Sequence, residues 1–361
     1  WGKMQKDFHF CAVYVLCRLA GMESTYAEKT AYASQQVDDA VYNHALKFEN
    51  GDIFHQTQTA HKKLSFLESS DVNNSFNIWI PFHFLPAGID NEDPYLTETE
   101  SKTVELLKEK ITAAGSKAHG IHQLGIFLHL YADTYSHQGF KGFYDRSNFV
   151  KLTHGVEKLK FKDKCLKFAL INLPGLFPIG HLLVMKNPDI PYAEWEYYKS
   201  GVLYQVNNLE DRFMPAVENI FAFIREFLAE NTQYGTPVGG NILKSRISKI
   251  RNTLAEQAFL EGRYHNWLDK IHNNFFDFKD FDQQDRTLNY DDRAWFKNAV
   301  KAVKVPKYSL EGLKSRAYNY HRFYKKYGFE HSDWTLYMQA AAEHKYRVLH
   351  QVLAEAGLTV A

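Results

Sequence analysis

Leu124-Gly-Ile-Phe-Leu-His129-Leu-Tyr-Ala-Asp133-Thr-Tyr-Ser-His137-Gln-Gly-Phe140 is the stretch that says most about how this chain folds. Its near-continuous apolar residues predict a long buried helix over residues 118–138. His129, Asp133 and His137 recur every four residues, so a helix places all three on one stripe. A buried carboxylate between two imidazoles is costly unless it is paired or binds a metal ion. The stretch therefore predicts a metal-binding helix, with a metal-free His-Asp-His hydrogen-bond network as the alternative.

Helical spacing of apolar residues extends over most of the chain, and strand signals are few. The sequence therefore predicts an all-α protein. Residues 233–240, which contain three glycines and a proline, are the best candidate linker. We expect a metal-binding helical domain over residues 1–232 and a helical C-terminal extension over residues 241–361. The expected helices are residues 9–20, 24–47, 101–114, 118–138, 207–231, 241–274, 291–303 and 309–356.

Composition excludes some classes of protein. The 361 residues carry a net charge of +1, so no overall field draws the chain to nucleic acid or to an anionic membrane. No apolar run reaches the roughly 18–20 residues that a membrane span needs. The three cysteines form no Cys-x-x-Cys pair, which argues against a thiolate-bound zinc site. Histidine is the informative residue, because 11 of the 17 lie between His9 and His181.

Further candidate ligands lie on both sides of the central helix. His9 lies in a buried N-terminal helix, and a helical stretch ends at the adjacent carboxylates Asp38 and Asp39. Another apolar, proline-bounded run contains His83, and His61 is its alternative. Imidazole and carboxylate ligands without thiolate favour zinc, and their number exceeds one four-coordinate site. The sequence therefore predicts two or three zinc ions.

The order of these residues resembles the zinc-dependent phospholipase C and single-strand nuclease superfamily. The ending Asp133-x3-His137-Gln-Gly-Phe is most similar to its heterokaryon-incompatibility branch and to uncharacterised bacterial members. The resemblance covers roughly residues 1–200 and implies a compact helical fold with three zinc ions and a phosphodiester substrate. Mature chains of that superfamily begin with a metal-binding tryptophan, and this chain begins with Trp1.

The resemblance implies a role for each candidate residue. Trp1 and His9 would bind one zinc ion, and Asp133 would bridge it to a second. The second ion would be completed by His83 and His129, with Asp39 or Asp38 as a ligand or as the general base. The third ion would be bound by three residues, which are His137, His181 and Asp189.

Two spacings depart from the superfamily pattern. Three residues separate Asp133 from the next histidine, where five are usual. Met185 occupies the position four residues after His181, where a carboxylate is usual; Asp189 is the expected substitute, and the pair His154 and Glu157 competes with it.

The most favoured function is a phospholipase C-like phosphodiester hydrolase that uses metal-activated water. Its substrate would be a phospholipid or another phosphodiester, with possible contact to a membrane surface. The first alternative is a single-strand nuclease, for which a basic and aromatic C-terminal segment (Lys314, Arg316, Tyr318, Tyr320, Arg322, Tyr324, Lys325 and Lys326) would bind nucleic acid. The second is a non-catalytic, metal-stabilised helical protein or toxin component. A processed Trp1 would imply a secreted or periplasmic protein, and otherwise a cytoplasmic one.

Overall fold

The computed structural model describes residues 6–61, 74–156, 179–304 and 321–359. Its central element is α7 (Gly120–Ser136), and every residue of this helix is buried. Several helices pack around α7, among them α2, α6, α9 and α15. Because water reaches no face of α7, its polar side chains must find partners within the protein. The prediction of a buried helix at this place is confirmed.

The remaining helices surround α7 and vary widely in length. The longer ones are α1 (Val13–Ala20), α2 (Ser24–Asp39), α6 (Lys102–Ala114), α9 (Met214–Glu230), α10 (Asn241–Ala255), α11 (Leu260–His272) and α15 (Asp333–Arg347). The short ones are α5 (Ile80–Phe82), α12 (Gln283–Thr287), α13 (Ala294–Ala299) and α16 (Leu353–Glu355). Short π-helical stretches are η1 (Asp7–Ala12), η2 (Ser75–Trp79), η6 (Leu209–Phe213) and η10 (Val348–Val352). Single 3₁₀ turns are η3 (Arg146–Asn148), η4 (Leu182–Val184), η5 (Asn187–Asp189), η7 (Thr232–Tyr234) and η9 (Phe329–His331). In the described parts of the chain, no helix has both the length and the apolar character to cross a bilayer.

Gly125 allows α2 to cross α7 at short range. A Cβ atom at this position would lie 2.4 Å from the carbonyl oxygen of Thr30 and 2.6 Å from the Cβ of Ala33. Only glycine leaves room for such an approach between two helices. The close crossing brings the C-terminal end of α2, with Asp38, beside the part of α7 that carries His129.

The prediction of an all-α protein is wrong, because 56% of the structure is helical and 13% lies in strands. The strands form three small antiparallel sheets, so the fold is mixed α and β. The sheets are β1 (Ala45–Lys47) with β2 (Ile53–His55), then β3 (Val150–His154), β4 (Glu194–Lys199) and β5 (Val202–Asn207) in that order, and β6 (Val300–Lys304) with β7 (His321–Lys325).

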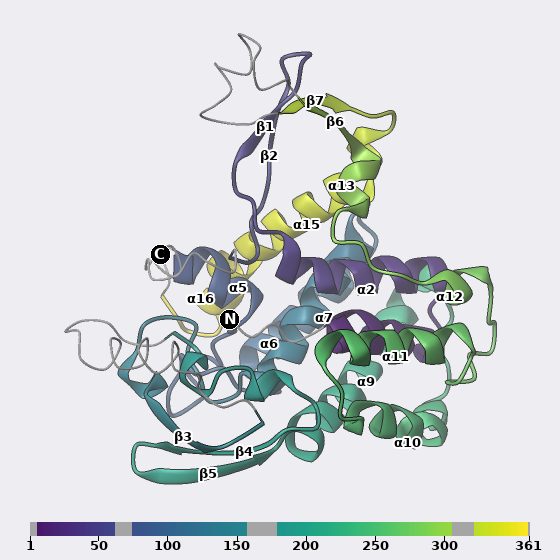
Figure 1. Ribbon diagram of the computed structural model, residues 1–361. Helices are drawn as coiled ribbons and strands as arrows, with labels where there is room; N and C mark the ends of the chain where they lie inside the picture. Colours follow the sequence, from purple (N-terminus) through teal and green to yellow (C-terminus); the bar gives the residue numbers. More distant parts are fainter. Residues whose placement is uncertain (1–5, 62–73, 157–178, 305–320, 360–361) are drawn as a thin grey trace.

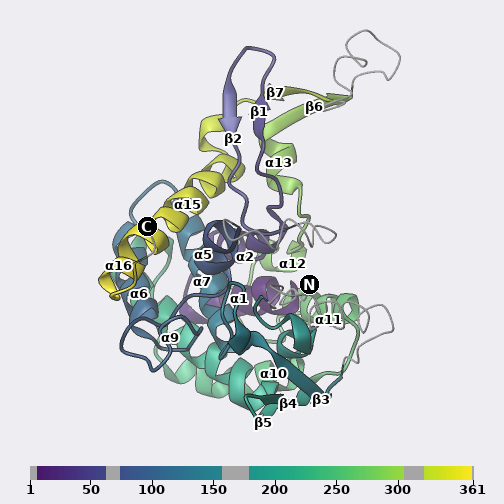
Figure 2. The ribbon, with the colours of Figure 1, turned by 90° about the vertical axis from the view of Figure 1, so that its left-hand side faces the viewer.

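Strands also replace parts of three of the expected helices. The helix expected over residues 24–47 ends at Asp39, because the chain continues into β1. The helix expected over residues 291–303 ends at Ala299, where β6 begins. Within the helix expected over residues 309–356, residues 309–320 lie outside the described chain, β7 occupies His321–Lys325, and α15 begins only at Asp333. The β1–β2 hairpin and the β6–β7 pair project together from the helical body in both views (Figures 1 and 2). They contact each other through a bridge between Phe48 and Phe323.

One hydrophobic core extends across the expected domain boundary. Phe8 and Leu128 from the first part share this core with Trp267, Tyr290 and Leu353 from the second. Two smaller clusters adjoin it, one between α2, α7 and α15 and one beneath the β3–β4–β5 sheet. The residues expected to form a C-terminal extension therefore pack directly against the part of the chain that was expected to bind metal.

Candidate metal centre

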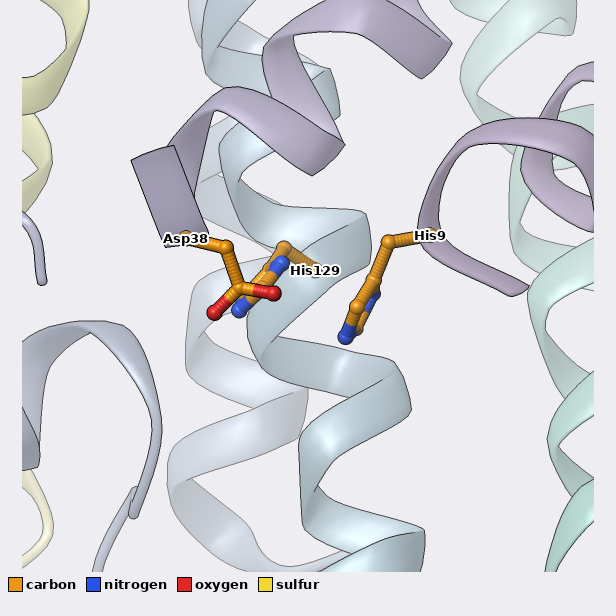
Figure 3. Close-up of side chains that lie close together, drawn as sticks. All are labelled: His9, Asp38 and His129. Atoms are coloured by element: carbon orange, nitrogen blue, oxygen red, sulfur yellow. The ribbon is translucent and has the colours of Figure 1, made fainter. Parts of the chain in front are cut away.

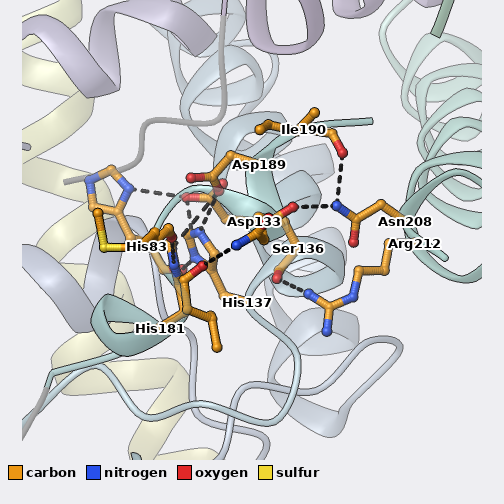
Figure 4. Close-up of polar contacts among 12 residues, drawn as sticks. His83, Asp133, Ser136, His137, His181, Asp189, Ile190, Asn208 and Arg212 are labelled. Carbon is orange, nitrogen blue, oxygen red and sulfur yellow. Dashed lines mark hydrogen bonds and ion pairs between the residues drawn. The ribbon is translucent and has the colours of Figure 1, made fainter. Parts of the chain in front are cut away.

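Three groups of buried imidazoles and carboxylates lie along the C-terminal half of α7. The first group is His83, His129 and Asp133, the second is His9, Asp38 and His129, and the third is His137, His181 and Asp189. In each group the potential ligand atoms lie within 4.8 Å of one another. The second and third groups are shown in Figures 3 and 4.

The first group has the dimensions of a zinc site. Oδ2 of Asp133 lies 3.0 Å from Nδ1 of His83 and 3.3 Å from Nε2 of His129. The two ring nitrogens are 3.3 Å apart. Ligands about 2.0 Å from a tetrahedral zinc ion are separated from one another by about 3.3 Å. These residues would supply three protein ligands to such an ion, which is the number that catalytic zinc sites use.

The backbone partner of His83 determines which ring nitrogen faces the Asp133 carboxylate. Nε2 of His83 lies 2.9 Å from the carbonyl oxygen of Thr59, which only accepts hydrogen bonds, so Nε2 carries a hydrogen. Nδ1 then faces the Asp133 carboxylate with a lone pair, unless it carries a second proton. A metal ion or that proton must therefore lie between the two groups. A backbone partner of this kind is the usual way to orient a metal-binding histidine.

The second group meets the other oxygen of Asp133. Nε2 of His9 lies 3.3 Å from Oδ1 of Asp133, yet neither atom forms a hydrogen bond. The His9 ring stacks on His129 with their centroids 3.8 Å apart. The rings of His9 and His129 and the carboxylate of Asp38 face a shared space, and they come from η1, α7 and α2 (Figure 3). Asp133 is thus shared between two sets of histidines.

Backbone carbonyls orient both histidines of the third group, as the carbonyl of Thr59 orients His83. Nδ1 of His137 donates to the carbonyl of His83 at 2.8 Å, and Nδ1 of His181 donates to the carbonyl of Met185 at 2.9 Å. In the neutral rings both Nε2 atoms would present lone pairs, and they lie 3.7 and 3.9 Å from Oδ1 of Asp189. Both carboxylate oxygens of Asp189 are buried without a hydrogen bond. Buried polar atoms of this kind need a partner, and a cation supplies one.

The electrostatics favour a charged carboxylate at Asp133 and neutral imidazoles at His9 and His181. Burial opposes ionisation of Asp133, but His137 and His129 outweigh it and hold its pKa well below the usual value. Burial, reinforced by His129, lowers the pKa of His9. Burial also lowers the pKa of His181, to about 4. For His137 the carboxylates of Asp133 and Asp189 outweigh burial and raise the pKa. At neutral pH His9 and His181 are therefore already in the form that binds metals.

The structure brings together most of the residues expected from the sequence. Each of seven expected ligands belongs to one of the three groups: His9, His83, His129, Asp133, His137, His181 and Asp189. Asp38 is also a member, whereas Asp39 belongs to none of the groups in the described chain and accepts a hydrogen bond from Tyr290 at 2.9 Å. His61 lies beside Trp79, with ring centroids 5.4 Å apart. Trp1 and Glu157 lie outside the described residues.

Supporting residues of the site were not expected from the sequence. Thr59 orients His83 through its backbone, so its side chain gave no signal. Asp7 forms a buried ion pair with Arg263 in α11, with Nε and Oδ2 2.7 Å apart. The sequence indicates Asp7 only by its position two residues before His9. Its partner Arg263 is 256 residues away, so the sequence gives no sign of the pairing.

Comparison with known proteins places nearly the whole chain in one family. The family DUF6765, described as a family of unknown function, has a model that matches residues 4–352. No curated protein and no solved structure matches the chain. The likeness to zinc phospholipases and nucleases therefore stays a prediction. Since the match includes α7 and the C-terminal helices together, the chain belongs to the DUF6765 family.

Proposed function

We propose that the protein is a zinc-dependent phosphodiester hydrolase that uses metal-activated water. The sharing of Asp133 carries this proposal, because one oxygen faces His9 and the other faces His83 and His129. A carboxylate between two sets of imidazoles suits a pair of metal ions. Paired ions can stabilise both the attacking and the leaving oxygen of an in-line displacement at phosphorus.

The donor set fits zinc. All candidate ligand atoms are imidazole nitrogens or carboxylate oxygens, and the two cysteines of the described chain, Cys11 and Cys17, are free and lie outside the three groups. The first group has a zinc-like spacing and would supply three protein ligands. The third group is slightly wider and has a complete set of hydrogen bonds behind its histidines. These features support two ions at Asp133 and one at Asp189.

In the proposed mechanism, the histidines would bind the metal ions and Asp38 would act on the bound water. His83, which the carbonyl of Thr59 orients, and His129 would hold one ion, and His9 would hold its neighbour. Zinc lowers the pKa of a bound water to about 7 and neutralises charge on the phosphoryl group. Asp38, buried beside His9 and His129, would orient this water and accept its proton. Asp38 takes this role in preference to Asp39, which faces Tyr290.

A phospholipid is the favoured substrate. The β4–β5 hairpin exposes four apolar or aromatic side chains, which are Tyr198, Val202, Leu203 and Tyr204. Its sheet adjoins the third group, because Tyr197 contacts Phe140 and Phe140 contacts His181, with ring centroids 6.0 and 6.2 Å apart. Exposed tyrosines with aliphatic neighbours suit the interface of a lipid surface.

The complete burial of the ligands favours one alternative, a non-catalytic protein in which metal ions only stabilise the fold. His9 and His129 are 0% exposed, and Asp133 is 1% exposed. Structural zinc sites are closed in this way, with no position left for substrate. Such a protein would bind metal stoichiometrically and hydrolyse nothing.

Metal analysis followed by substrate assays tests the proposal. The purified protein should contain two or three zinc ions by plasma mass spectrometry, and Asp133→Ala should lose at least two. His122→Gln is a matched control, because His122 is a buried histidine of the same helix that pairs with Asp333 instead of the groups. The loaded protein should cleave phosphatidylcholine vesicles faster than single-stranded DNA. Metal-free wild-type protein, or metal-loaded protein that cleaves neither substrate, would overturn the proposed hydrolase.

A further inference from the structure

The turn that carries Asp189 is held by one side chain from outside the site. Asn208, which is 0% exposed, follows β5. Its Nδ2 donates to the carbonyl of Asn187 at 2.5 Å and to the carbonyl of Ile190 at 2.8 Å. These two carbonyls flank Asp189 in the chain, so the amide of Asn208 closes the turn around this carboxylate (Figure 4).

A tryptophan fixes the orientation of the Asn208 amide. Nε1 of Trp195 can only donate, and it lies 2.9 Å from Oδ1 of Asn208. The amide oxygen therefore faces Trp195, and the amide nitrogen must face the two carbonyls. The backbone nitrogen of Asn208 also donates to the carbonyl of Ala193 at 3.0 Å. The amide nitrogen of Asn208 thus holds the turn, while its amide oxygen is bound to Trp195.

The position of Asp189 needs such support. Its two oxygens are buried without hydrogen bonds, and Oδ1 lies between His137 and His181. Without a metal ion, burial of this carboxylate is unfavourable, so the turn would relax toward solvent unless it were held. A preformed third group therefore depends on contacts that the ligands themselves do not make.

We propose that Asn208 is a positioning residue that holds Asp189 in place for a metal ion bound with His137 and His181. This inference rests on the proposed metal centre and deepens it, but it does not require that the protein be a hydrolase. Supporting residues of this kind change metal affinity by about 10–100-fold when they are replaced. Asn208 differs from the usual case because it acts through the backbone around the ligand.

Asn208→Asp is the sharpest test. It preserves the shape and an acceptor for Trp195, but it removes both donors and sets a carboxylate against two carbonyls. Asn208→Leu removes the donors without adding charge. His181→Ala provides the reference for loss of the third ion. Asn231→Asp is the matched control, because Nδ2 of the buried Asn231 also donates to two backbone carbonyls, those of Thr112 and Phe227.

The experiment measures zinc content and zinc affinity after chelation and reloading. We expect both Asn208 variants to lose one ion, or to bind the weakest ion about 10–100-fold less tightly, as His181→Ala does. Asn231→Asp should retain every ion. Thermal unfolding with and without zinc adds a second readout: a positioning role reduces the stabilisation by zinc, whereas a purely structural role lowers both midpoints equally.

Three results would overturn the inference: Asn208 variants with wild-type zinc content and affinity, an equal loss in Asn231→Asp, or wild-type protein with no third ion to lose. A wild-type protein that binds three ions but hydrolyses no phosphodiester overturns only the proposed hydrolase. In that case the loss of one ion in the Asn208 variants would still support the positioning role.

Discussion

The buried ion pair between Asp7 and Arg263 gives the most direct test of how the two halves of the chain depend on each other. Asp7 is 1% exposed and Arg263 is 3% exposed. Nε of Arg263 lies 2.7 Å from Oδ2 of Asp7, and Nη1 donates to the carbonyl of Ala258. Asp7 lies two residues before His9 in η1, and such positions point to nearly opposite sides of a helix. Arg263 therefore holds η1 from the side opposite α7.

The expected loss of folding free energy follows from leaving a desolvated carboxylate without its partner. Arg263→Met preserves much of the side-chain volume but leaves the Asp7 carboxylate buried without its partner. Breaking a buried pair in this way costs about 3–5 kcal/mol of folding free energy. Replacing both members with apolar residues of similar size is often neutral, or stabilising by about 1–4 kcal/mol. The double variant Asp7→Leu/Arg263→Met should therefore be much more stable than Arg263→Met alone.

Urea unfolding in EDTA measures this effect without any contribution from bound metal. Arg263→Met should lower the unfolding free energy by about 3–5 kcal/mol, and the double variant should recover most of it. Zinc affinity of Arg263→Met should also fall, since η1 carries His9. A loss below about 1 kcal/mol would match an exposed pair and would refute the buried contact between α11 and η1.

Three further predictions concern other parts of the structure. Asp133→Asn should abolish binding of the two ions that share this residue and leave the third, which metal analysis will show; retention of all ions would contradict the bridging role. Burial, reinforced by Arg347, lowers the pKa of His344 from 6.5 to about 3. Its folded pKa is thus below the unfolded value, so wild-type stability is lost as pH falls, by about 1.4 kcal/mol on reaching pH 5.5. Urea unfolding of His344→Gln should lack this part of the slope, and an unchanged slope would show that His344 is not buried as a neutral ring. Gly125→Ala should cost about 1–3 kcal/mol because its Cβ would meet α2, and an unchanged melting temperature would contradict the close crossing.

The central helix and its candidate ligands could be predicted from the sequence because their geometry is local. Spacings of four residues place His129, Asp133 and His137 on one stripe whatever surrounds the helix. The choice between Asp38 and Asp39 as the residue that faces the site depends on contacts between helices, which the local sequence does not determine. Adjacent residues point in directions about 100° apart on a helix, and only the packing of α2 on α7 decides which one faces the site. Gly125 permits that close packing, but a single glycine in an apolar helix does not predict where another helix crosses it.

The strands β4 and β5 had signals in the sequence, in a stretch to which no helix had been assigned. Residues 194–199 and 202–207 have the length and aromatic content of strands, and Ser200-Gly201 separates them as a two-residue turn. Both turn residues have positive φ values, 50° and 82°, which is the geometry of a tight β-hairpin. The segment Val300–Lys304 was harder to assign, because its five residues directly follow α13 and their partner strand begins at His321.

The C-terminal half cannot be regarded as a separate unit added to a metal-binding domain. Arg263 holds η1, Tyr290 binds Asp39, Tyr337 contacts the hydroxyl of Thr59, and His344 contacts the carbonyl of Pro81. These contacts are made with the segments that carry His9, Asp38 and His83, or with their immediate neighbours. Ligands on separate short segments need external support to hold a metal geometry, because α7 alone supplies only one stripe. The family match over residues 4–352 is consistent with this dependence, since it includes the supporting helices together with the ligands.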